Sequence, residues 1–92
     1  MPRDAKLYSG FMNHDYVLAF DVADEDAREK IMTLCATDWQ GDRVNATTWE
    51  ISTKMSPDAL EKEILARLSE GDRAVYYYLS DSKRMFRVVL SG

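Results

Sequence analysis

The acidic residue best placed to do chemistry is Asp21, which ends an otherwise apolar run. Side chains at strand ends, beside loops, often build binding and catalytic sites. Hard cations such as Mg²⁺ take oxygen ligands and often use only one or two protein carboxylates, keeping water in the other positions. A two-fold dimer could bring two copies of Asp21 together and supply both. The alternative is a structural role, in which this carboxylate caps the adjoining loop through its backbone N–H groups.

Two other reactive residue types occur once each, as His14 and Cys35. His14 could bind a metal or act as a base, but a lone histidine before the first strand is more often simply exposed. A single cysteine excludes an intrachain disulfide and a Cys-based zinc or iron–sulfur site, and it fits a reducing cytosol. The sequence has no Ser/His/Asp order, no Gly-rich phosphate loop and no paired zinc-ligand motif, so hydrolase-type nucleophilic catalysis is unsupported.

The charges are unevenly distributed along the chain. The formal net charge is −4, so general attraction to nucleic acid is not expected. Residues 21–42 hold seven acids and two bases, a net of −5, whereas residues 73–92 hold four bases and one acid, a net of +3. Chance on solvated faces would account for this pattern. The sharper interpretation is a local basic surface that meets phosphate or an acidic partner, carried by Lys83, Arg84 and Arg87.

Three consecutive tyrosines at 76–78 raise the possibility of RNA stacking. The RNA-recognition module shares the βαββαβ element order, but its Gly-Phe/Tyr signature on the third strand is absent. In a strand, Tyr76 and Tyr78 share one face and Tyr77 the other, so at least one of them should belong to the core.

The bulk composition predicts one small globular domain. The chain has 92 residues, 46% hydrophobic and 30% charged. No apolar run is long enough to span a bilayer, and the N-terminus lacks the apolar core of a secretory signal. We therefore expect a cytoplasmic protein, with residues 1–14 as a tail or extension and residues 15–92 as the domain.

The elements that must position these residues follow from periodicity. Tyr16–Val22 predicts a strand that is apolar on both faces until Asp21. Acids at 24–26 predict a helix start, with Asp26 and Glu29 at capping-box spacing. Its apolar stripe contains Ala27, Ile31, Leu34 and Cys35, which makes Cys35 a small buried residue.

Residues 42–45 and 47–53 are predicted to form two short strands or one bent strand, after a loop at 39–42. Two more strands are predicted at 73–79 and 84–90, joined by a hairpin turn at 80–83. Ser56-Pro57-Asp58 is a helix start, and Gly71 fits the end of that helical region. Glu63 and Arg67 can pair on the outer face of this helix, opposite a buried stripe of Leu60, Ile64, Leu65 and Leu68. Trp49 and Phe20 are expected in the core.

The predicted fold is α+β: a ferredoxin-like βαββαβ order with an additional C-terminal strand and two helices on one face of an antiparallel sheet. The other face carries Val17 and Ala19 and would be left partly uncovered. Dimerisation through that face or through an edge is the simplest remedy.

Three segments, taken together in their order and spacing, resemble the CRISPR-associated protein two family: FDVADEDAREKIMTL, DRVNATTWEI and GDRAVYYYLSD. The run YVLAFD is also similar to the first strand of virulence-associated protein D, a toxin-type relative. The resemblance covers roughly residues 16–90. It implies a ferredoxin-like homodimer in which Asp21 matches the metal-binding aspartate of a Mg²⁺-dependent nuclease acting on RNA or DNA.

Some members of the family that this chain resembles act as structural dimers that bind DNA and the CRISPR integrase. Two hypotheses follow. The first is a homodimeric Mg²⁺-dependent endonuclease with Asp21 as catalytic metal ligand. The second is a non-catalytic dimeric adaptor for nucleic acid or for a protein such as an integrase or an antitoxin-type partner.

Overall fold

The computed structural model describes residues 14–79 and 84–92. The predicted N-terminal tail, apart from His14, and the predicted hairpin turn at 80–83 lie outside the described residues. The elements in chain order are β1 (His14–Asp21), α2 (Glu25–Thr33), the π-helical segment η2 (Leu34–Asp38), β2 (Asp42–Asn45), β3 (Thr48–Thr53), α3 (Pro57–Leu65), β4 (Arg73–Leu79) and β5 (Met85–Ser91).

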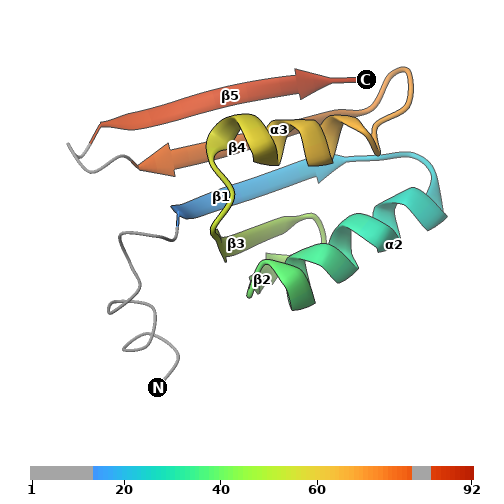
Figure 1. The fold of residues 1–92 in the computed structure, drawn as a ribbon. Coiled ribbons are helices and arrows are strands. Elements are labelled where there is room, and N and C mark those ends of the chain that lie inside the picture. Colours follow the sequence, from blue (N-terminus) through green and yellow to red (C-terminus); the bar gives the residue numbers. More distant parts are fainter. Residues whose placement is uncertain (1–13, 80–83) are drawn as a thin grey trace.

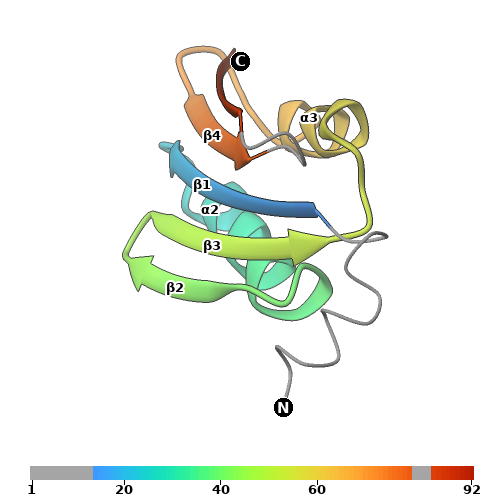
Figure 2. The ribbon, with the colours of Figure 1, turned by 90° about the vertical axis from the view of Figure 1, so that its left-hand side faces the viewer.

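The described strands form a five-stranded antiparallel sheet in the order β2-β3-β1-β4-β5. The central strand is β1, and helices α2 and α3 both lie on one side of the sheet (Figures 1 and 2). The predicted α+β class is therefore shown, and this layout is compatible with a ferredoxin-like arrangement. Neither α2 nor α3 has the length and apolarity needed to cross a membrane.

Strand β1 shows how one sequence serves both sides of the sheet. Leu18 and Phe20 are buried beneath the helices, whereas Val17 and Ala19 point the other way and are half-buried. Alternation with a period of two is what a strand requires, and side chains that are apolar on both faces suit a central position. The predicted strand is confirmed, with its start two residues earlier and its end one residue earlier.

Helix α2 begins among the acids at 24–26, as predicted, but its N-cap lies two residues before the position that the capping-box spacing predicts. The N-cap is Asp24, whose side chain accepts a hydrogen bond from the backbone N–H of Ala27 at 2.9 Å. The predicted pair of Asp26 and Glu29 was wrong, because Asp26 already lies inside the first turn. There its charge still complements the positive end of the helix dipole.

Helix α3 begins as predicted. The Ser56 hydroxyl accepts from the N–H of Ala59 at 3.4 Å, and Pro57 occupies the first turn. The side chains of Glu63 and Arg67 lie 3.2 Å apart as an ion pair. The predicted stripe was wrong at Leu65, which is 41% exposed where the helix ends.

The core lies between the helices and the sheet and includes the predicted aromatics Trp49 and Phe20. It also includes Trp39, which the sequence placed in a loop. A Cβ added to Gly41 would lie 2.5 Å from the Cys35 carbonyl oxygen, so only glycine allows this loop to approach η2 so closely. The close approach encloses the Trp39 region within the core.

Asp72 is a buried carboxylate that ties together two loops at the end of the sheet. Its Oδ1 accepts from the N–H of Ala23 at 3.1 Å, and its Oδ2 accepts from the N–H of Ser69 at 2.8 Å. These bonds favour the ionised form and hold the pKa of Asp72 below its usual value. Gly71, just before it, has φ +89°, which glycine adopts without strain. The prediction that Gly71 ends α3 was wrong, because that helix already ends at Leu65.

Candidate functional site: the open face of the sheet

The side of the sheet away from the helices, here called the open face, carries a continuous apolar strip. Register places Val17 opposite Tyr77, Ala19 opposite Val75, and Val75 opposite Val89. Tyr77 is 37% exposed and Val89 54% exposed. Single exposed apolar residues are ordinary, whereas a contiguous strip on one face needs an explanation.

The charges of this face are sorted by strand. One row across the sheet runs from Asp42 on β2 and Glu50 on β3, through Val17 and Tyr77, to Arg87 on β5. The acids and the base are thus separated by the apolar strip. A surface built this way is polar at both ends, with opposite signs, and apolar in the middle.

Asp21, the candidate metal ligand and catalytic residue, lies on this face at the exposed end of β1. Its cross-strand neighbour is Arg73 of β4. Across residues 14–79 and 84–92, no group of three or more His, Cys, Asp or Glu side chains is placed to hold a metal ion. Asp21 therefore does not belong to such a cluster within the described residues, and a second copy could supply a further carboxylate.

The capping role considered for Asp21 is filled by two other acids. The N–H of Ala23 in the following loop donates to Asp72, and the N–H of Ala27 donates to Asp24. Asp21 is consequently left on the open face as a surface carboxylate, with Arg73 beside it in the sheet.

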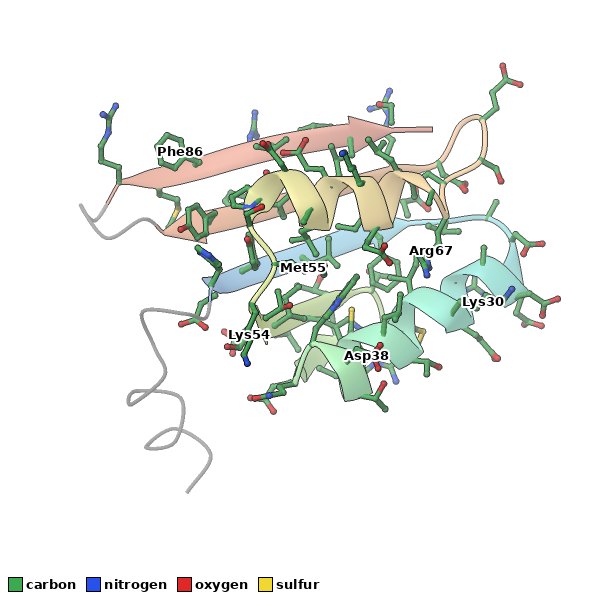
Figure 3. The ribbon with its side chains drawn as sticks, viewed as in Figure 1. Lys30, Asp38, Lys54, Met55, Arg67 and Phe86 are labelled. Atoms are coloured by element: carbon green, nitrogen blue, oxygen red, sulfur yellow. The ribbon has the colours of Figure 1, made fainter. Side chains whose placement is uncertain are left out.

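Of the candidate nucleic-acid residues, Arg84 and Arg87 lie on opposite sides of the sheet. Lys83 lies outside the described residues. The guanidinium of Arg84 lies 5.8 Å from the ring centroid of Phe86, at the start of β5 (Figure 3), and Phe86 pairs with Tyr78 on the helix side. Arg87 is opposite Tyr77 on the open face. The structure therefore separates Arg84 from Arg87 by the thickness of the sheet.

A second group of ionisable side chains lies on the helix side of β1 and β4. His14 Nδ1 lies 2.9 Å from the Tyr78 hydroxyl, and the Tyr78 ring stacks on Tyr16 with centroids 5.2 Å apart. Tyr76 is fully buried, as the alternation of the tyrosines predicts, and donates its hydroxyl proton to Glu61. Burial is the largest cause that raises the pKa of Tyr16 and of Tyr76, so both hydroxyls stay protonated.

Cys35 is fully buried, as predicted, and burial raises the pKa of its thiol to about 12. A protonated, enclosed thiol is a poor nucleophile and metal ligand. Cys35 is therefore a packing residue.

The sequence prediction missed Asp42, Glu50 and Arg73 as members of one surface with Arg87. The signal was present for Glu50 and Arg73, because each of them lies next to a core residue along its strand. It was absent for Asp42, because all four residues of β2 are exposed. Without the strand register, however, the sequence cannot show which charges face which. No family model, no curated protein and no solved structure matches this chain.

Proposed function

We propose that this chain is a non-catalytic homodimeric adaptor of the ferredoxin-like class, with β5 as its additional strand, in which two copies pack their open faces together. The observation that carries the proposal is the apolar strip, half-buried at Val17 and exposed at Tyr77 and Val89 in a single protomer. A domain of 92 residues buries a modest fraction of its surface, so covering this strip would add stability.

The geometry supports binding over catalysis. The charged side chains of the open face are spread one or two to a strand. Tyr76 and Cys35, which the sequence offered as candidate functional residues, are packed in the core. The dimer would leave the helix side free. The partners that the resemblance implies, an integrase or an antitoxin-type protein, would then bind outside the contact between the two copies.

Sedimentation equilibrium on the full chain tests the dimer. We expect a mass twice the 10.6 kDa of the chain at micromolar concentration. Tyr77→Glu, which places a charge in the strip, should give the single-chain mass. Leu65→Glu is the matched control, because Leu65 is an exposed apolar residue on α3, and it should remain dimeric. A wild-type monomer at these concentrations would refute the proposal.

A second candidate is the Mg²⁺-dependent endonuclease, favoured by the position of Asp21 on the same face as the strip. Two Asp21 carboxylates brought together would repel one another, and Mg²⁺ would relieve the repulsion. This candidate predicts that Asp21→Asn raises metal-free stability and abolishes both stabilisation by Mg²⁺ and cleavage of RNA or DNA. Thermal melts of both proteins with and without millimolar Mg²⁺ or Mn²⁺ test it, and the adaptor predicts no metal effect.

A further inference from the structure

We infer that the two protomers pack with their two-fold axis along the strands, between β1 and β4, so that Arg87 of one protomer meets Glu50 of the partner subunit and Arg73 meets the partner's Asp21. This inference rests on the proposed dimer and specifies its geometry. It also gives Asp21 a partner in the interface, a cation rather than a second carboxylate.

The first step is the sorting of charges by strand. Within the described strands, the acids of the open face lie on β2, β3 and β1, and its two bases lie on β4 and β5. The acids are Asp15, Asp21, Asp42 and Glu50, and the bases are Arg73 and Arg87. The open face therefore has an acidic half on β2, β3 and β1 and a basic half on β4 and β5. The boundary between the two halves runs parallel to the strands.

The second step is the choice of axis direction. A two-fold axis that runs across the strands lays each strand over its own copy, so the basic half would meet a basic half. An axis that runs along the strands reverses the strand order, so the half carried by β4 and β5 meets the half carried by β3 and β1. Like charges facing one another at an interface oppose binding, whereas opposite charges fix the register.

The third step is the position of the axis. If it lay over β1, the two Asp21 carboxylates would face each other and the two Asp15 carboxylates would do the same. If it lies between β1 and β4, Val17 of one protomer lies opposite the partner's Tyr77, and Glu50 lies opposite the partner's Arg87. In another row across the sheet, Asp21 lies opposite the partner's Arg73. Only the second position brings apolar groups onto apolar groups and opposes no like charges.

The spacing of packed sheets allows these contacts. Stacked sheets lie about 10 Å apart, and the strands of one sheet cross those of the other at about 30°. A side chain can therefore reach the facing strand of the partner even where the residue rows of the two sheets are not aligned. Arginine and glutamate side chains are long enough to meet across that layer at the edge of the apolar strip. The four strands β3, β1, β4 and β5 would take part, and β2 would lie outside the contact.

Charge reversal tests the pairing through the dimer dissociation constant, measured by sedimentation velocity at low salt. Arg87→Glu and Glu50→Arg should each raise the constant roughly tenfold or more. Mixing the two single variants should restore association to within a few-fold of wild type, because each supplies the charge that the other lacks. Lys62→Glu and Glu70→Arg, at exposed positions off the open face, make the same charge changes and should have little effect.

The outcomes separate the inference from the proposed dimer. A monomeric wild type refutes the dimer itself. A dimeric wild type whose affinity neither reversal alters, or whose single variants stay dissociated when mixed, refutes this geometry and leaves the dimer standing. Circular dichroism of each variant confirms that it is folded before the mixture is measured. Recovery in the mixture alone establishes that positions 50 and 87 meet between protomers.

Discussion

The two faces of the sheet are built from the same strands but differ in what covers them. On the helix side, Leu18 and Tyr76 are enclosed by packing within the chain, and the buried carboxylate of Asp72 has its hydrogen bonds supplied by backbone N–H groups. On the open face, Val17 and Tyr77 lie on the same two strands. Within the described residues, no helix covers β1 and β4 on this side (Figure 2). The helix side of the sheet forms the buried core of the protomer, whereas the apolar side chains of the open face stay partly exposed.

This difference shows how a small α+β chain can divide its apolar residues between folding and assembly. The helix side supplies the stability of the protomer, so its substitutions should act on unfolding. In the proposed dimer the open face would supply the contact area and the sorted charges, so its substitutions should act on association. Each prediction below depends on that division.

Trp49→Ala should have the largest effect on unfolding. Trp49 is buried on the helix side, and truncation leaves a cavity that costs about 3–5 kcal/mol of unfolding free energy. Chemical denaturation at fixed protein concentration measures it. Val44→Ala on the exposed part of β2 is the control and should change stability by less than about 0.5 kcal/mol. A loss under about 1 kcal/mol at Trp49 would contradict its place in the core.

Two valines on adjacent strands, one on each face of the sheet, should show most clearly whether the two faces have different roles. Val88 packs against the core on β5, and Val75 lies on the open face of β4. Val88→Asp should lower the unfolding free energy of the protomer by about 2 kcal/mol or more, because it puts a carboxylate against apolar groups. Val75→Asp should instead abolish association while the far-ultraviolet circular dichroism stays unchanged. Equal unfolding losses in both variants would show that the two faces do not differ as described.

Asp72 should make stability depend on acid pH. Its pKa is lower folded than unfolded, so the unfolded state binds more protons as the pH falls below about 4. The stabilisation is thus fully present above the unfolded pKa and is lost as pH falls through the folded pKa. Asp72→Asn should be less stable at pH 7 and show a shallower acid loss than wild type. If the unfolding free energies of wild type and Asp72→Asn fell equally steeply with decreasing pH, this would argue against the role of Asp72.

Asp24→Ala should have the smallest effect, about 0.5–2 kcal/mol, through loss of the N-cap of α2. Asp26→Ala is the matched control inside the first turn, and it should lose only a weaker interaction with the helix dipole. Urea denaturation of both variants distinguishes them. A larger loss at Asp26 would restore the capping box that the sequence favours.

Local patterns predicted the elements well. The alternation in β1 and the Ser56-Pro57 start of α3 both depend on a few neighbouring residues, and the structure confirms them. The failures depend on tertiary structure. Leu65 has the spacing of a core residue, but α3 ends there and leaves it exposed, whereas Trp39 is buried because Gly41 lets its loop approach η2 closely.

The candidate site was predictable only in part for the same reason. Sequence identified Asp21 and Arg87 as separate features. The sheet order and register then placed Glu50 on the same row as Arg87 and Arg73 beside Asp21. Those relations arise from pairing between strands distant in the chain, which periodicity within one strand does not encode.

Isotope-filtered nuclear Overhauser measurements test the central claim most directly. A sample that mixes uniformly labelled and unlabelled chains reports only contacts between protomers. The proposed dimer predicts signals between the methyl groups of Val17 and the ring of Tyr77, and between the methyl groups of Val75 and Ala19, across the two copies. Intermolecular signals confined to the exposed side chains of Leu65 on α3 or Val44 on β2, with none from the open face, would contradict it.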